Sequence, residues 1–171
     1  MNVWDAIRSK RAIRRFTPEP LPQEVVERIL DAGRRSQSSK NSQPWHFVAV
    51  RDRDTLQTLS TMGDWMGHVA GAALCVVIVI PATPNDRHPW HMFDTGQSAA
   101  YMQLAAQELG VGSCLGTIYR TDDVRALLGL PPEHEARIVI SFGYPHPDQQ
   151  RAGAGKAGRR ALDEVVHWEK W

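Results

Sequence analysis

Apolar and polar positions alternate along this chain with periods that predict strands and helices in loose succession. The clearest strand covers 72–80, a β-branched run that is apolar on both faces and therefore typical of a central strand in a covered sheet. Shorter apolar runs predict strands at 47–50 and 138–142, and residues 112–119 predict a strand interrupted by Gly116. A glycine within a strand often marks a bulge or a place where the backbone meets a ligand.

Helical periodicity fills the intervals between these strands. A short helix is expected over 2–10, and a second begins at Pro22, with Gly33 as its C-terminal stop. Later helices are delimited by polar caps and by glycine stops. The expected caps and stops are Asp52 or Asp54 for the third helix, Asp94 and Gly110 for the fourth, and Thr121 and Gly129 for the fifth.

Residues 36–45 join the second helix to the first strand and are crowded with serine, asparagine and glutamine. These side chains donate and accept hydrogen bonds, and their backbones tolerate turn conformations. Taken alone, such a stretch is typical of a solvated connecting loop. The alternative is a loop that holds a polar ligand against a rigid scaffold.

Composition bounds the class of protein. With 171 residues, 42% hydrophobic and 23% charged, the chain is expected to form one soluble, cytoplasmic domain. A net charge of +1 gives no global field for nucleic acid or a membrane surface, and the longest apolar run is too short to span a bilayer. Cys75 and Cys114 are expected to be buried free thiols, with a single disulfide between them as the alternative.

The basic residues are nevertheless unevenly distributed. Five of them lie between Arg8 and Arg15, and Lys156, Arg159 and Arg160 lie near the end of the chain. The first group is either a solvated basic face or a phosphate clamp, because guanidinium groups present a fork of donors that matches phosphate oxygens. No metal site is expected, since no acidic residue or cysteine joins His88 and His91 at a ligand spacing.

The end of the chain carries large apolar residues after a Gly- and Ala-rich connector at 149–158. They are Val165, Val166, Trp168 and Trp171. Because such residues rarely stay exposed, this arm is expected either to fold back or to pack on a second subunit. A Rossmann dinucleotide domain is disfavoured, since no Gly-x-Gly-x-x-Gly follows the first strand.

Three separated features, taken together, resemble the nitroreductase family of FMN-dependent oxidoreductases. They are the basic stretch at 10–16, the polar stretch at 38–47 with its Asn-Ser-Gln-Pro-Trp motif, and Arg159-Arg160 ahead of the C-terminal arm. The resemblance covers nearly the whole chain and implies one domain, 1–171, of α+β class. That domain would have a central mixed, mainly antiparallel sheet flanked by helices, in an intertwined homodimer with a dimerisation arm around 159–171.

The resemblance also implies which residues bind FMN at the dimer interface. Lys10, Arg11 and Ala12 would hold the phosphate and ribityl chain, and Arg14 would approach the pyrimidine edge of the flavin. The remaining implied contacts are Ser38, Ser39 and Asn41 from the other subunit, the backbone at Leu115 and Gly116 beside the ring, and Arg159 and Arg160 at the phosphate. A further polar contact to the ring is expected between Arg53 and Gly67, at a position the sequence does not identify.

The implied reaction is ping-pong transfer of reducing equivalents from NADH or NADPH through FMN to a nitroaromatic, quinone or related acceptor. No side chain is required as nucleophile or general base, because the flavin carries the redox step. Ala12 stands where the family often has serine, which predicts one hydroxyl contact fewer. The alternatives are a flavin enzyme with another reaction, such as reductive dehalogenation or a specialised oxidation, and a non-enzymatic binding protein with basic arms for nucleic acid. The low net charge opposes the nucleic-acid-binding alternative.

Overall fold

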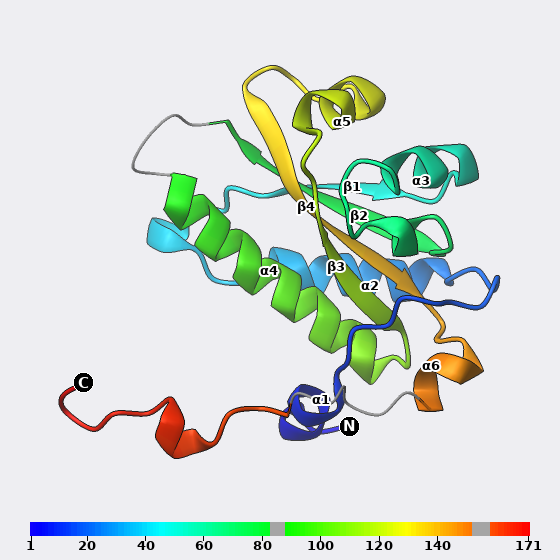
Figure 1. Cartoon of the computed structure of the whole chain (residues 1–171). Helices are drawn as coiled ribbons and strands as arrows, with labels where there is room; N and C mark the ends of the chain where they lie inside the picture. Colours follow the sequence, from blue (N-terminus) through cyan, green and yellow to red (C-terminus); the bar gives the residue numbers. More distant parts are fainter. Residues whose placement is uncertain (83–87, 152–157) are drawn as a thin grey trace.

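The computed structural model describes residues 1–82, 88–151 and 158–171 and shows a sheet with helices on both faces (Figure 1). The sheet has four strands in the order β1-β2-β4-β3, and every neighbouring pair is antiparallel. The strands are β1 His46–Val50, β2 Leu74–Pro81, β3 Gly112–Thr117 and β4 His134–Gly143. A single parallel bridge joins Ala12 to Ser113 beside β3. The predicted α+β class with a mixed, mainly antiparallel sheet is confirmed.

Strand β2 crosses the middle of the sheet and is buried from Leu74 to Ile80. Its alternate side chains point to opposite faces, so Val76 and Ile78 join one hydrophobic core while Val77 and Val79 join another. The prediction of a covered central strand is therefore confirmed.

The described helices are α1 Val3–Ser9, α2 Gln23–Arg34, α3 Arg53–Leu59, α4 His88–Glu108, α5 Thr121–Leu128 and α6 Pro147–Arg151. Four of them, α2 to α5, contribute side chains to these two cores. Helices α2 and α4 pack on one face of the sheet through Ile29 and Met102. Helices α3 and α5 cover the other face through Leu56 and Val124. None of the described helices combines the length and the apolar composition that crossing a bilayer requires.

Several predicted helix ends are confirmed. The Asp52 side chain caps α3 by accepting a hydrogen bond from Thr55 N at 2.9 Å. Gly110 and Gly129 follow α4 and α5 with φ of 72° and 63°, a left-handed conformation that glycine adopts at low cost.

Three other predictions of helix ends are wrong. Gly33 lies inside α2, where an added Cβ would stand 2.8 Å from Met102 Cγ, so close packing against α4 rather than a turn requires glycine. Helix α4 begins at His88, before Asp94, because Pro89 is compatible with the first turn. Arg120 precedes α5 without a side-chain cap, so Thr121 is its first residue. Irregular segments were expected at 81–89 and 149–158. Of these, residues 83–87 and residues 152–157, which include Lys156, lie outside the described residues.

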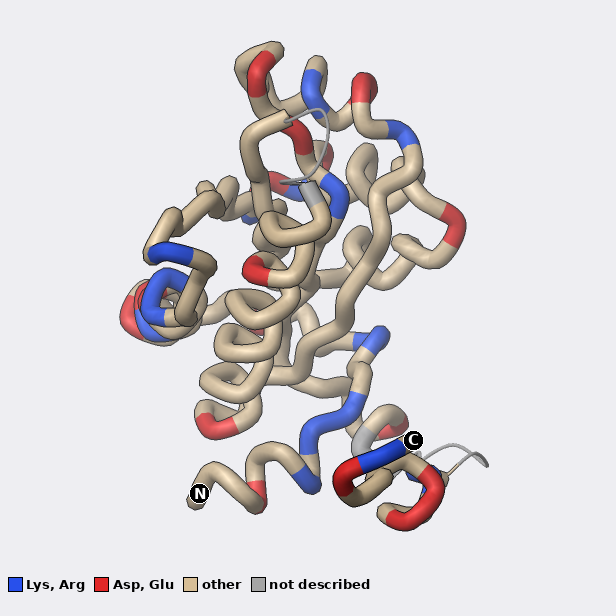
Figure 2. Tube along the Cα trace, turned by 90° about the vertical axis from the view of Figure 1, so that its left-hand side faces the viewer, with Lys and Arg blue, Asp and Glu red and all other residues tan. Residues whose placement is uncertain are grey.

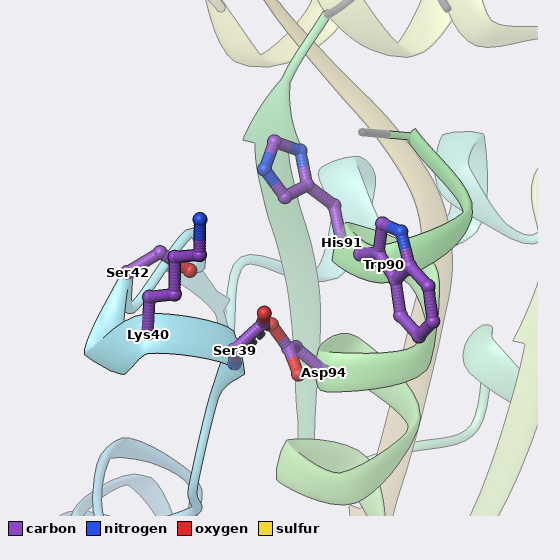
Figure 3. A pocket seen from close by; sticks show the side chains of 6 residues that line it. All are labelled: Ser39, Lys40, Ser42, Trp90, His91 and Asp94. Atoms are coloured by element: carbon purple, nitrogen blue, oxygen red, sulfur yellow. Dashed lines mark hydrogen bonds between the residues drawn. The ribbon is translucent and has the colours of Figure 1, made fainter. Parts of the chain in front are cut away.

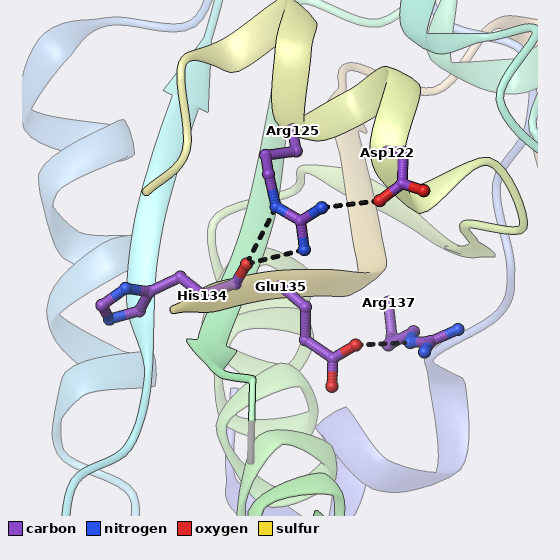
Figure 4. A network of polar contacts seen from close by, with 5 residues as sticks. All are labelled: Asp122, Arg125, His134, Glu135 and Arg137. Atoms are coloured by element: carbon purple, nitrogen blue, oxygen red, sulfur yellow. Dashed lines mark hydrogen bonds and ion pairs between the residues drawn. The ribbon is translucent and has the colours of Figure 1, made fainter. Parts of the chain in front are cut away.

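Polar contacts fasten α5 to the start of β4 (Figure 4). The Arg125 guanidinium donates to the His134 carbonyl from Nε at 3.4 Å and from Nη2 at 3.3 Å, and to Asp122 Oδ1 at 2.6 Å. Glu135 and Arg137 pair at 3.0 Å on the neighbouring part of the strand. These contacts explain how a short helix holds its place on the sheet.

Candidate functional site

The basic segment, residues 10–16, is attached to the sheet by its backbone. Ile13 N donates to Ser113 O at 2.9 Å, and Phe16 bridges to Pro145. The attachment is close, because an added Cβ on Gly112 would stand 2.8 Å from Ile13 Cβ. The side chains of the segment therefore project from a backbone that the sheet holds in place.

Three cations gather around this segment. Lys10 is close enough to Arg14 and Arg159 for their charges to act on it. Burial lowers the pKa of Lys10, and these two cations lower it further, whereas the Cys114 thiol raises it. Figure 2 shows the basic stretch that follows α1 and the C-terminal arm at the same end of the molecule. Within the described parts of the chain, none of the three forms an ion pair with a carboxylate. The cluster is therefore suited to bind an anion.

The neighbouring cations are held by partners of their own. Arg11 Nη1 donates to the carbonyls of Arg8 and Lys10 at 2.6 and 2.8 Å. Arg160 pairs with Glu164 at 3.3 Å. Of the predicted phosphate contacts, the structure thus brings together Lys10 and Arg159 and holds Arg11 and Arg160 in local contacts.

Strand β3 presents an open edge beside the three cations. Ser113 O accepts from Ile13 on the side away from β4, and alternate residues of an antiparallel strand point the same way. The backbone N–H and C=O of Leu115 therefore point to this edge, where the Leu115 side chain is 44% exposed. Gly116 does not interrupt the strand, because the β3–β4 register runs unbroken through it. Its missing Cβ is explained by Met66 and Val139, which that Cβ would meet at 3.0 Å.

His68 lies behind this edge and was missed by sequence reasoning. It is 7% exposed, and its Nδ1 is 2.7 Å from Ser141 Oγ on β4. Burial lowers the pKa of His68, and the charge of Arg14 lowers it further. The signal in the sequence is a single ionisable side chain among small and apolar residues, one position beyond the interval in which a polar contact was expected.

Both cysteines are buried and free, as predicted. Burial raises the pKa of the Cys75 thiol to about 12. Burial also raises the pKa of Cys114, although Arg14 and Lys10 oppose the change. Both thiols are therefore protonated at neutral pH, which is unsuited to a nucleophile.

The polar loop, residues 38–43, is held by side chains and contains unusual backbone conformations. Ser39 N donates to Asp94 Oδ2 on α4 at 3.0 Å, and Gln43 N donates to Ser38 Oγ at 2.9 Å. Lys40, Asn41 and Gln43 have φ of 53°, 54° and 46°, in the left-handed region. After the loop, the buried Trp45 enters the core between α2 and the sheet and anchors this end of the loop.

A hollow of about 340 Å³ lies between the polar loop and the start of α4 (Figure 3). Its lining residues are Ser39, Lys40, Ser42, Trp90, His91 and Asp94. The indole of Trp90 is largely exposed at its rim, so the hollow combines an aromatic surface with polar groups.

The polar loop and the basic segment lie toward opposite ends of α4 in one chain (Figure 1). Asp94 holds the polar loop, whereas Gln107 Nε2 donates to Ser9 Oγ of α1 at 3.2 Å. At 1.5 Å per residue these two points on α4 are about 20 Å apart. One chain therefore does not bring Ser38, Ser39 and Asn41 to the cations.

The model of the Nitroreductase family matches residues 7–66 and 62–144. The chain belongs to this family. A provisionally named NADH dehydrogenase/NAD(P)H nitroreductase of Archaeoglobus fulgidus is 33% identical to this nitroreductase-family chain, over 96% of each protein. An iodotyrosine deiodinase of Nematostella vectensis is also 33% identical, over 95% of this chain and 73% of the relative.

The fold of the family member agrees with solved structures. A provisionally assigned nitroreductase of Desulfovibrio desulfuricans, solved in complex with FMN, superposes with a TM-score of 0.80 at 28% identity. The match covers 100% of this chain and 98% of that one. The resemblance stated from the sequence motifs is confirmed.

Proposed function

We propose that this nitroreductase-family chain is a homodimeric, cytoplasmic oxidoreductase that passes electrons from NADH or NADPH through FMN to a nitroaromatic, quinone or related acceptor. The observation that carries the proposal is the cluster of Lys10, Arg14 and Arg159 beside the open edge of β3. The names of the Archaeoglobus and Desulfovibrio relatives support the donor and the cofactor. The buried free thiols of Cys75 and Cys114 support a reducing compartment.

The residues present fit FMN. Because burial and two like charges disfavour the charged form of Lys10, a bound phosphate dianion would compensate both effects. The backbone N–H and C=O of Leu115 can hydrogen-bond the polar edge of a flat ring lying along β3. Ala12 is exposed beside β3 and offers no hydroxyl there, so its contribution is limited to its backbone.

The roles of the side chains follow from this arrangement. When bound, FMN supplies the two-electron chemistry, so the protein needs no nucleophile. Lys10 and Arg159 would hold the phosphate, while Arg14 would stabilise the negative charge that reduction places on the ring. Leu115 would present an apolar side chain next to the ring and help to exclude water.

A second copy of the chain would complete the site. The polar loop lies about 20 Å along α4 from the basic segment. At this separation, one FMN molecule would not contact both segments of the same chain. Helix α4 exposes Trp90, Phe93 and Tyr101, and the C-terminal arm exposes Trp168 and Trp171. Large exposed apolar side chains favour burial against a partner. We therefore assign Ser38, Ser39 and Asn41 to the FMN site of the opposite subunit.

Purification tests this proposal directly. We expect a yellow protein whose flavin absorbance is bleached anaerobically by NADH or NADPH and restored by a nitroaromatic or a quinone. Light scattering should give twice the mass of the 171-residue chain. A colourless protein that takes up no added FMN would contradict the proposal.

A second candidate reaction is reductive dehalogenation, which the deiodinase relative favours. It keeps the flavin site and changes the acceptor. This reaction would be selected over the first by two results together. The flavin would stay oxidised with both NADH and NADPH, and the chemically reduced protein would release iodide from iodotyrosine.

A further inference from the structure

His68 combines burial, a fixed orientation and one nitrogen that makes no hydrogen bond of ordinary geometry with the described residues. Its Nδ1 is held at 2.7 Å from Ser141 Oγ, and the same hydroxyl lies 3.4 Å from the Cys114 carbonyl. Within the described residues its Nε2 is buried and makes no hydrogen bond of ordinary geometry. That nitrogen lies behind the open edge of β3, since an added Cβ on Gly116 would stand 3.4 Å from it.

The groups around His68 explain its charge state. The Leu115 carbonyl favours the protonated ring, whereas burial and Arg14 oppose it more strongly and keep the pKa below its usual value. The Ser141 hydroxyl on β4 contacts the ring and does not titrate, and it also lies near the carbonyl of Cys114, whose thiol has a pKa raised by burial. Arg14 is the charged side chain that acts on the ring, so an added negative charge beside Arg14 would oppose its effect and favour protonation of His68.

We propose that His68 is a redox-linked proton acceptor, which takes up one proton from solvent when the flavin at the β3 edge is reduced. The inference rests on the proposed function, because the negative charge is that of reduced FMN near Arg14. In the coupled step NADH, oxidised FMN, neutral His68 and one solvent proton give NAD⁺, singly anionic reduced FMN and protonated His68. The hydride moves from nicotinamide to flavin, and the proton bonds to His68 Nε2, where the Leu115 carbonyl favours the protonated form.

Linkage makes the coupling measurable as a potential. If reduction raises the affinity of His68 for a proton, protonation raises the flavin midpoint potential by the same free energy. With two electrons, uptake of one proton lowers the potential by about 30 mV for each tenfold fall in proton concentration, and uptake of two lowers it by about 59 mV. The steeper slope is expected between the pKa values of His68 in the oxidised and reduced protein, because only there does reduction change its protonation.

The decisive experiment is anaerobic spectroelectrochemistry of the FMN-loaded protein from about pH 5 to about pH 9. The variants are His68→Gln, whose amide can occupy the place of Nε2, and His68→Asn, whose amide can keep the Ser141 contact. We expect a steep window in the wild-type protein and the shallow slope throughout that window in both variants. If the steep dependence of the midpoint potential on pH persists in both variants, it belongs to the flavin itself, and the inference is overturned. Equal shallow slopes in the wild-type protein and both variants would also overturn it.

A measurement on the wild-type protein removes dependence on variants that fail to fold. Histidine-labelled NMR titration of the oxidised and reduced protein should give a higher pKa for His68 after reduction. Equal values in the two states would overturn the inference and leave the proposed function intact. Failure of the wild-type protein to take up FMN would overturn both.

Discussion

The basic segment and the polar loop are held in place by different kinds of contact. The basic segment is fixed by main-chain bonds to the sheet, such as Ile13 N to Ser113 O. The polar loop is fixed by side chains, chiefly Asp94 and Ser38, and has left-handed backbone at Lys40. Main-chain bonds to a strand edge position a segment whatever its side chains are. The conformation of a loop that is held by a carboxylate depends on that side chain.

This difference separates ligand binding from stability. On the basic segment, Lys10 and Arg14 make no ion pair with a carboxylate of the described residues, so their loss should affect anion binding while folding is retained. In the polar loop, removal of a side chain should alter the conformation first and binding only as a consequence. The following substitutions test the contrast in order of expected effect.

The largest effect on binding is expected for Arg14→Ala. Loss of a charge-assisted contact of about 1.5–3 kcal/mol should weaken FMN binding roughly 10-fold to 100-fold. Fluorescence titration of FMN measures the affinity, and the free energy of unfolding should change little. Arg15→Ala is the matched control, because Arg15 is adjacent to Arg14 but pairs with Asp148 at 3.3 Å. Equal losses in the two variants would remove Arg14 from its assigned role.

Gly112→Ala should detach the basic segment from its strand. The new methyl group would stand 2.8 Å from Ile13 Cβ, and overpacking of this kind costs about 1–3 kcal/mol. Urea unfolding should show the loss of stability, and FMN affinity should fall with it because Lys10 and Arg14 move. Gly71→Ala adds a methyl group to open space and should change neither quantity. Retained affinity in a destabilised Gly112→Ala protein would show that attachment to β3 does not position the cations.

The sequence predicted features that depend on neighbours along the chain. The covered strand β2, the Asp52 cap and the glycine after α4 follow from local pattern and backbone geometry. Lys10 and Arg14 of the basic segment also lie close enough for their charges to interact, and their role in binding FMN stays a prediction. These features could be read because each is decided within a few residues.

Features decided by distant packing were predicted wrongly or not at all. Gly33 is required by Met102 of α4, and Asp94 serves the polar loop instead of capping its own helix. His68 is placed by Ser141, far away in the sequence, so the local sequence shows an ionisable side chain among small and apolar residues but not where that side chain lies. The proposed contact between two chains likewise depends on surfaces that periodicity does not describe.

Asp94→Ala should loosen the polar loop with a smaller effect on binding. The carboxylate of the buried Asp94 accepts from the N–H of the exposed Ser39 at 3.0 Å, and loss of this hydrogen bond costs about 1–2 kcal/mol. Limited proteolysis should detect faster cleavage within residues 38–43, and FMN affinity should fall by less than in Arg14→Ala. Asp94→Asn keeps an acceptor oxygen and should lose less stability. If both variants match the wild-type protein, the loop is held by its other contacts.

The smallest effect is expected for Lys40→Gly, and its sign distinguishes strain from ordinary loop flexibility. Lys40 has φ of 53°, which costs an L-residue about 1 kcal/mol and costs glycine almost nothing. The substitution should therefore leave the free energy of unfolding unchanged or raise it by up to about 1 kcal/mol. Ser42→Gly, in the same loop but with φ of −68°, should lower it, because glycine there only adds freedom to the unfolded chain. Equal destabilisation by both glycines would mean that the left-handed backbone at Lys40 carries no strain, and that the side-chain contacts of Asp94 and Ser38 distinguish this loop from the basic segment.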